Sequence, residues 1–145
     1  MSRKPSGIEY YKGNYKYQLK TAVEYETGIT GHAYTLPFCS LDAKGLLTIQ
    51  PGYAWDGPSG PTIDTPSFMR GSLIHDVIYQ LLRQPDFETD ETERILLRHR
   101  ADLILHDICV EDGMWKWRAR WVLRGVRAGG GPSAAVKERK VYTAP

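Results

Sequence analysis

The stretch that divides this chain into two halves is Pro51-Gly52-Tyr53-Ala54-Trp55-Asp56-Gly57-Pro58-Ser59-Gly60-Pro61. Proline and glycine at this density exclude a helix or a central strand, so we expect turns here. The sequence before this stretch has the pattern of β-strands, and the sequence after it has the pattern of helices. The stretch also contains Trp55 and Asp56, and loops of this kind often carry functional side chains.

The first half alternates between two kinds of side chain with a period of two. Over residues 15–25 the odd positions are aromatic, aliphatic or threonine, and the even positions are mostly polar. This pattern is typical of a half-buried strand. Two further strands are expected over 32–38 and 46–50, the second after a turn at 42–45. Together these features predict an antiparallel β-meander.

The second half has the period of amphipathic helices. A first helix is expected over 66–83, capped by Thr65 with Pro66 in its first position. A second begins near Thr89 or Asp90 and runs to 111, and a third spans 114–128, after which Gly-Gly-Gly-Pro ends regular structure. The expected apolar stripes are Ile74, Val77, Ile78 and Leu81; then Leu97, Ala101, Ile104 and Ile108, widened by Leu96, Leu103 and Leu105; then Trp115, Ala119, Val122 and Val126.

These patterns predict an α+β fold, with an N-terminal antiparallel β-meander followed by a three-helix C-terminal half. We expect one globular domain over 1–128 and a flexible or partner-docking basic tail over 129–145. A chain of 145 residues with 41% hydrophobic residues is long enough for one core. No apolar run approaches the roughly 20 residues that span a bilayer, the N-terminus has no signal-peptide pattern, and two cysteines indicate no disulfide framework.

The charge is unevenly distributed along the chain. The whole chain has a net charge of +2, but residues 114–145 contain eight basic residues and only Glu138 as an acidic one. A basic end suggests an acidic partner surface: nucleic acid, an anionic membrane or an acidic protein. We find no specific nucleic-acid motif.

The residues best suited to chemistry are His75 and Asp76 in the first predicted helix, with Tyr79 one turn further on. A neutral imidazole can take a proton from water near neutral pH. Asp76 points about 100° away from His75 on a helix. It would therefore not orient the ring, but it could hold a metal ion or a substrate group nearby. The alternative is that His75 flanks the core and Asp76 is solvated.

Two further carboxylates are candidates. Asp56, in the glycine-rich stretch, can present oxygens to calcium, or it can form an Asx-turn with its own backbone. Asp102 shares a helix face with His99 and His106, a spacing that could bind a metal. That face lies opposite the main apolar stripe, where exposed polar residues are expected. The motifs of P-loop, dinucleotide-binding, zincin and α/β-hydrolase proteins are absent from the sequence.

The third predicted helix mixes tryptophans with basic residues: Trp115, Trp117 and Trp121 with Lys116, Arg118, Arg120 and Arg124. The mixture is typical of a helix at a membrane surface, of a helix that docks on protein or nucleic acid, or of a core helix with solvated arginines. Because a small domain needs apolar surface for its core, we expect the tryptophans to pack inward.

Three motifs occur in one order: Asp56-Gly57-x-Ser59-x-Pro61, His75-Asp76-x-x-Tyr79 and Arg100-Ala101-Asp102. Together they resemble a family of uncharacterised phage and prophage proteins, and the resemblance covers residues 53–112. It implies a phage-encoded protein that is made in the host cytoplasm, with the virion as an alternative location. The family brings no assigned activity.

The same order is similar to that of the bacterial phospholipases A2, in which D-G-C-S precedes C-x-x-H-D-x-x-Y and a later helix adds an Asp. This resemblance implies that His75 is the base that activates water, that Asp102 orients it and that Tyr79 belongs to the same site. It also implies that Asp76 and the loop around Asp56 hold a Ca²⁺ ion.

The sequence departs from the phospholipase pattern at Pro58 and Ser72, which stand where that family has cysteines. We nevertheless expect a His/Asp hydrolase-type site, esterase- or phospholipase-like and calcium-assisted, that acts at the host envelope. One alternative is a non-enzymatic virion component of the tail or baseplate, with the basic C-terminus docked on other virion proteins. Another is an intracellular antagonist of a host defence protein.

Overall fold

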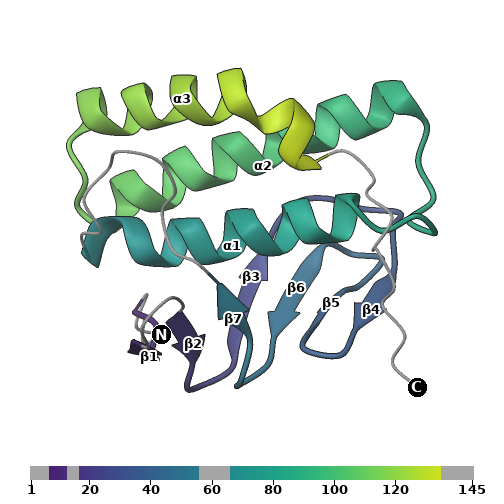
Figure 1. Cartoon of the computed structure of the whole chain (residues 1–145), viewed down its shortest axis with the longest axis horizontal. Helices are drawn as coiled ribbons and strands as arrows, with labels where there is room; N and C mark the ends of the chain where they lie inside the picture. The colour runs from purple at the N-terminus through teal and green to yellow at the C-terminus, as the bar shows by residue number, and fades with distance from the viewer. Residues whose placement is uncertain (1–6, 13–16, 56–65, 135–145) are drawn as a thin grey trace, which may run out of the picture.

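The computed structural model of the chain describes residues 7–12, 17–55 and 66–134, with side chains described up to residue 128. Two antiparallel sheets form one layer, and three helices lie over one face of it (Figure 1). The described strands are β1 (Tyr10–Lys12), β2 (Tyr17–Leu19), β3 (Val23–Glu26), β4 (Tyr34–Leu36), β5 (Cys39–Leu41), β6 (Leu46–Ile49) and β7 (Ala54–Trp55). The helices are α1 (Pro66–Leu82), α2 (Glu91–Glu111) and α3 (Lys116–Ala134). The predicted α+β class is confirmed.

The strand order shows how the expected meander is built. The larger sheet has the order β3-β6-β5-β4, so β4, β5 and β6 follow the chain while β3 pairs with the far edge of β6. The smaller sheet has the order β1-β2-β7. The single strand predicted over 15–25 is therefore wrong within the described residues, because β2 pairs with β7 and β3 pairs with β6. The two-residue β7 lies at the edge of its sheet, within the stretch where only turns were expected.

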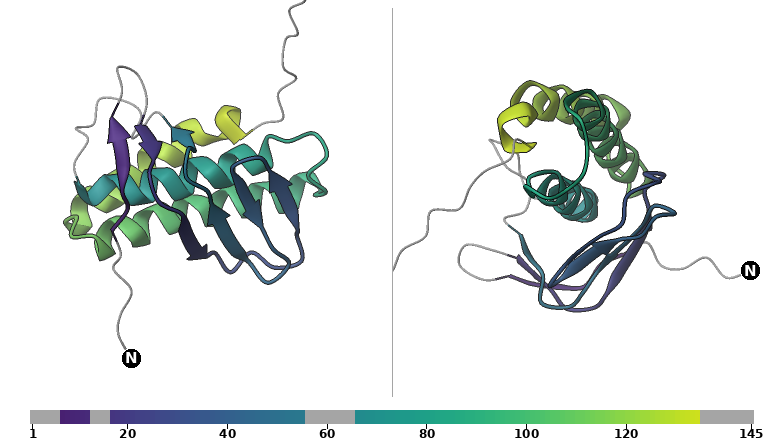
Figure 2. Two further views of the ribbon diagram at one scale, coloured as in Figure 1. Left: turned by 90° about the horizontal axis from the view of Figure 1, so that it is seen from below. Right: turned by 90° about the vertical axis from the view of Figure 1, so that its right-hand side faces the viewer.

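Helix α1 lies between the sheets and the other two helices (Figure 2). Its predicted stripe, Ile74, Val77, Ile78 and Leu81, is buried in the main core together with β-sheet residues such as Leu47 and Ile49. The flank of α1 that carries His75 is covered as well. His75 and Tyr79 are buried too, because α2 packs against that side of the helix.

Helix α2 begins as predicted, because Asp90 caps it by accepting a hydrogen bond from the backbone N–H of Glu93 at 2.7 Å. Its predicted stripe is buried at Ala101, Ile104 and Ile108. The widening of that stripe toward Leu96 and Leu103 is wrong, since both side chains are exposed. The buried surface extends toward Asp102 instead, because α2 contacts both α1 and α3.

Helix α3 departs furthest from the prediction. It continues to Ala134 instead of ending at residue 128. The inward packing expected for the tryptophans is wrong. Ala119 and Val122 form the packed face, and small side chains there let α3 approach the other helices.

Over the described residues, no helix has the length and apolar character needed to cross a bilayer.

Candidate active site

One carboxylate oxygen joins the two helices at the candidate site. Oδ1 of Asp102 on α2 lies 2.8 Å from Nε2 of His75 on α1, and it accepts a 2.6 Å hydrogen bond from the hydroxyl of Tyr79. The Asp102 side chain is fully buried. The rings of His75 and Tyr79 lie against each other, with centroids 4.1 Å apart. Three residues that the sequence placed in one site, from two helices, are therefore in direct contact.

This hydrogen bond fixes which nitrogen of His75 can act as a base. An ionised carboxylate can only accept hydrogen bonds, so Nε2 carries the proton and donates it to Asp102. In the neutral ring the lone pair is then on Nδ1. Nδ1 faces Asp76, whose Oδ1 is 3.8 Å away. That distance is too long for a hydrogen bond but short enough for electrostatic attraction when the ring is protonated.

The electrostatic surroundings act on the dyad in opposite directions. Burial lowers the pKa of His75, but the hydrogen bond to Asp102 and the nearby carboxylate of Asp76 outweigh it, so the pKa is raised above the ordinary 6.5. Burial and the hydrogen bond to Asp102 also raise the pKa of Tyr79 well above 10.0. Tyr79 is therefore a hydrogen-bond donor at neutral pH and not a base.

The second oxygen of Asp102 has an unusual environment. Oδ2 is buried, and no described group forms a hydrogen bond with it. Nε of Arg98, one turn earlier on α2, is likewise buried and unpaired among the described residues. Buried polar atoms are nearly always paired in folded proteins, and exceptions require a specific explanation. The two atoms belong to side chains one turn apart on α2, next to the dyad.

Gly71 brings the two helices close enough for the dyad to form. A Cβ at this position would lie 2.9 Å from Cδ1 of Leu105 and 3.0 Å from Sγ of Cys109. Gly71 precedes His75 by one turn of α1, so this close approach of α1 to α2 lies beside the dyad. Gly71 was not among the residues predicted from the sequence to belong to the site. A glycine inside an otherwise apolar helical pattern is the signal that could have found it.

A second contact fixes the end of β7 against α1. The indole Nε1–H of Trp55 donates a hydrogen bond to Oγ of Ser72 at 3.2 Å, and the Ser72 hydroxyl donates to the carbonyl of Met69 at 2.8 Å. Ser72 and Asp76 are one turn apart on α1. The chain therefore reaches the helix at Trp55, immediately before Asp56, next to the turn that carries Asp76. Asp56 itself lies outside the described residues, as do Ser59 and the expected cap Thr65.

The structure does not bring the other expected ligands together. His106 interacts with its neighbour Asp107 at 2.9 Å, and Nε2 of His99 lies 3.3 Å from Nη2 of Arg98. Over the described ranges, no group of three or more His, Cys, Asp or Glu side chains could hold a metal ion. The described part of a calcium site would thus consist of Asp76 alone.

The two cysteines are not nucleophile candidates. Cys39 and Cys109 are both buried and unbonded to each other. Burial raises the pKa of Cys39 to about 11 and that of Cys109 to about 12, so neither is a thiolate at neutral pH.

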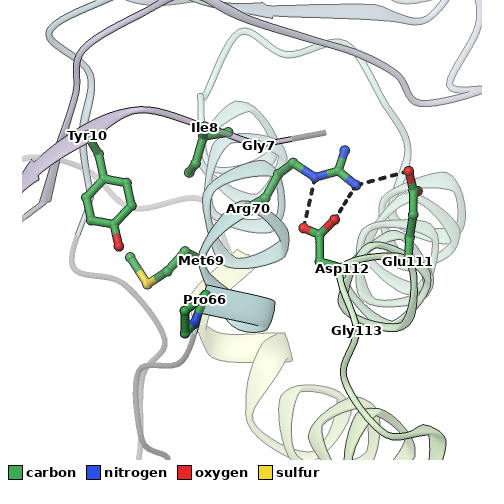
Figure 3. Close-up of a pocket in the computed structure, with 9 residues that line it drawn as sticks. All are labelled: Gly7, Ile8, Tyr10, Pro66, Met69, Arg70, Glu111, Asp112 and Gly113. Carbon is green, nitrogen blue, oxygen red and sulfur yellow. Dashed lines mark hydrogen bonds and ion pairs between the residues drawn. The ribbon is translucent and has the colours of Figure 1, made fainter. Parts of the chain in front are cut away.

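A pocket of about 490 Å³ lies between the start of α1 and the end of α2, and none of the dyad residues line it (Figure 3). Its charged residues pair with one another. Nε and Nη2 of Arg70 each donate a 3.0 Å hydrogen bond to the carboxylate of Asp112, and Nη2 lies 3.4 Å from Glu111. The two carboxylates of this pocket are therefore held in ion pairs with Arg70. We locate the candidate chemistry at the dyad, and we regard the Arg70–Asp112 pair as a contact that holds α1 against the end of α2.

Comparisons of the chain with protein-family models, with curated proteins and with solved structures give no match. The resemblances to phage proteins and to phospholipases A2 therefore stay predictions from the sequence motifs.

Proposed function

We propose that this chain is a hydrolase of esterase or phospholipase type in which His75 is the general base and Asp102 orients it. The observation that carries this proposal is the 2.8 Å contact between Nε2 of His75 and a fully buried carboxylate. It leaves Nδ1 as the basic nitrogen, on the side of the ring that faces the partly exposed Asp76. The His75 side chain is buried, with 10% of its surface exposed.

The chemical step needs only the imidazole and a water molecule. Nδ1 takes a proton from water while the water oxygen bonds to the ester carbonyl carbon. When the tetrahedral intermediate collapses, the carbon–oxygen bond to the alcohol breaks, and the proton on Nδ1 passes to the leaving oxygen. Asp102 stabilises the imidazolium that exists between these two transfers, and Tyr79 holds Asp102 in place through its 2.6 Å hydrogen bond.

Calcium is part of the proposal, with Asp76 and the loop around Asp56 as its protein ligands. The support is indirect. The carboxylate of Asp76, whose side chain is 39% exposed, faces Nδ1 of His75. Trp55, the residue before Asp56, is hydrogen-bonded to Ser72, one turn before Asp76 on α1. A calcium ion bound there would polarise the ester carbonyl. Because the described residues supply one ligand only, we derive no step of the reaction through the ion.

The motif order also supports a phage-encoded protein that acts at the host envelope. The ester substrates available there are membrane lipids, which is compatible with a base that needs only a carbonyl and water.

The test is hydrolysis by His75→Asn, compared with wild type and with the control His106→Asn. Substrates are short-chain nitrophenyl esters and phospholipid vesicles, with and without millimolar calcium. Loss of a general base lowers the rate by about 100-fold or more. His106 interacts with an aspartate as His75 does but lies outside the dyad, so its replacement leaves the rate unchanged. A folded wild-type protein that is inert on every substrate contradicts the proposal.

The calcium component has its own test. A ligand that binds only the folded state raises the melting temperature, so millimolar calcium should stabilise the wild type and should not stabilise Asp76→Asn. The exposed Asp107→Asn on α2 is the matched control. No shift in the wild type removes calcium from the proposal and leaves the dyad standing.

A second candidate function is a non-enzymatic virion component. The observation that favours it is the group of exposed tryptophans on α3, because such rings commonly mark docking surfaces. Mass spectrometry of purified particles decides this point: a virion component is present in them, whereas an enzyme that is released only in the host cell is not.

A further inference from the structure

Three tryptophans project into solvent from α3 and the residue before it. The exposed fractions are 71% for Trp115, 66% for Trp117 and 57% for Trp121, whereas Trp55 is only 3% exposed. Helix α3 is the layer farthest from the sheets (Figures 1 and 2). Its inward face is complete without these rings, since Ala119 and Val122 fill the contact with the other helices. The tryptophans therefore make no contribution to the core.

The charged side chains on the same face are all basic. Lys116, Arg120 and Arg124 are exposed on α3, and among the described residues none of them forms an ion pair. The sequence contains no Asp or Glu over 114–137. Trp117, Arg120, Trp121 and Arg124 line a shallow hollow of about 430 Å³. Around the helix, the arginines lie toward one edge of this face and the tryptophans toward the other.

We propose that this face of α3 binds an anionic lipid bilayer, with the helix parallel to the membrane surface. Indole rings prefer the boundary between headgroups and acyl chains, because they are apolar with one polar N–H. Lysine and arginine beside them attract anionic headgroups. A helix with both features binds in the plane of the interface. The positive charge of the surface and its aromatic side chains thus both fit an anionic bilayer.

The chemistry of the exposed side chains favours a bilayer over a specific protein partner. From 115 to 128 the polar side chains of α3 are all cationic or indole, so the face has hydrogen-bond donors and no acceptor. A specific protein interface forms its hydrogen bonds at defined positions around a packed core. A fluid anionic surface requires only positive charge and rings that can insert. This inference goes beyond the proposed function, since binding does not depend on the dyad.

The experiment uses the full chain and two kinds of vesicle: phosphatidylglycerol mixed with phosphatidylethanolamine, and pure phosphatidylcholine. Flotation measures binding, and tryptophan emission measures insertion. We expect binding to the anionic vesicles only, with a blue shift from the exposed indoles. Each basic residue near an anionic surface contributes about a fivefold change in affinity, so Arg120→Gln with Arg124→Gln should weaken binding by about 25-fold.

Matched control variants distinguish an effect specific to the α3 face from the effect of removing any exposed aromatic ring or any two positive charges. Trp121→Ala should weaken binding and reduce the blue shift, whereas Tyr11→Ala, an aromatic residue that is also 57% exposed, should not. Lys12→Gln with Lys44→Gln removes two exposed charges on the sheet side and should change binding little. His75→Asn should bind as the wild type does, so loss of hydrolysis and loss of binding are distinguished.

The proposal is overturned by an absence of flotation of the folded protein with anionic vesicles, by binding that is equal for all the α3 and control variants, or by preferential binding of single-stranded nucleic acid without vesicle binding. Self-association that Trp117→Ala abolishes, without any lipid binding, also overturns it and assigns the face to a second copy of the chain.

Discussion

Nε2 of His75 lies 2.8 Å from Oδ1 of Asp102, although the two residues are on different helices and Asp102 has no exposed surface. A buried carboxylate is costly unless it is paired, so this contact is a strong constraint on the packing of α1 against α2. It also sets the tautomer of the imidazole. Structure and chemistry therefore depend on the same bond, and its two consequences can be measured separately.

Asp102→Asn should destabilise the protein and lower the pKa of His75. Removing one partner of a buried charged pair costs about 3 kcal/mol, and the neutral amide no longer favours the imidazolium. Denaturant unfolding and NMR titration of the His75 ring provide the two measurements. The control is Asp107→Asn, whose side chain is 70% exposed beside His106 and whose loss should cost about 0–1 kcal/mol. Equal losses of unfolding free energy in the two variants would mean that the buried pair contributes no more stability than an exposed one.

Tyr79→Phe should cost more than Tyr53→Phe. The Tyr79 hydroxyl donates to the buried Asp102 carboxylate at 2.6 Å, whereas the Tyr53 hydroxyl donates to the neutral amide oxygen of Gln80 at 2.7 Å. Hydrogen bonds to charged groups contribute about 1.5–3 kcal/mol and neutral ones about 1 kcal/mol. Both variants keep the ring, so the difference in unfolding free energy isolates the charge. If Tyr53→Phe is the more damaging change, the hydrogen bond from Tyr79 to Asp102 is no stronger than one to a neutral acceptor.

Activity and stability should respond to pH in opposite directions. His75 must be neutral to act as a base, and its pKa is raised above 6.5, so kcat/KM should rise with pH and reach half its maximum above that value. A raised pKa in the folded state stabilises the protein when the group is protonated in both states. That contribution is complete below the unfolded pKa and is lost as pH rises through the folded pKa.

The stability part is measured as the difference in unfolding free energy between wild type and His75→Asn, at about pH 5.5 and about pH 9. The advantage of the wild type should be smaller at the higher pH. An advantage that grows with pH would show that burial, which lowers the pKa of His75, outweighs Asp102 and Asp76.

Gly71→Ala and Gly125→Ala should have opposite effects. An added methyl group at Gly71 would lie 2.9 Å from Leu105 and 3.0 Å from Cys109, whereas nothing lies within 4 Å of one at Gly125. Overpacking costs about 1–3 kcal/mol, while alanine in an exposed helix interior stabilises by about 1 kcal/mol over glycine. Thermal unfolding of both variants checks the signs. Gly71→Ala should also weaken activity, because it separates His75 from Asp102, and an active, stabilised Gly71→Ala would contradict the close approach of the helices.

The sequence by itself determined the fold class and the starts of α1 and α2. Pro66 begins α1 and Asp90 caps α2, because a fixed φ and a side-chain acceptor act within one turn of the chain. The alternation of side chains along a strand could also be predicted, because it too is set by neighbouring residues of the chain. Tyr17 and Leu19 are buried and Gln18 is exposed, as a period of two requires. The motif order also indicated that His75, Tyr79 and Asp102 belong together.

Only the tertiary structure decided which helix faces are buried. Periodicity placed Asp102 on a face open to solvent and His75 at the flank of the core, and both are buried, since α1 and α2 each pack against more than one neighbour. The reverse holds for Trp115, which periodicity placed in the core and which is 71% exposed. An apolar stripe specifies one buried face. How many faces of a helix are covered depends on the neighbours that surround it, and a single helix's sequence does not contain that information.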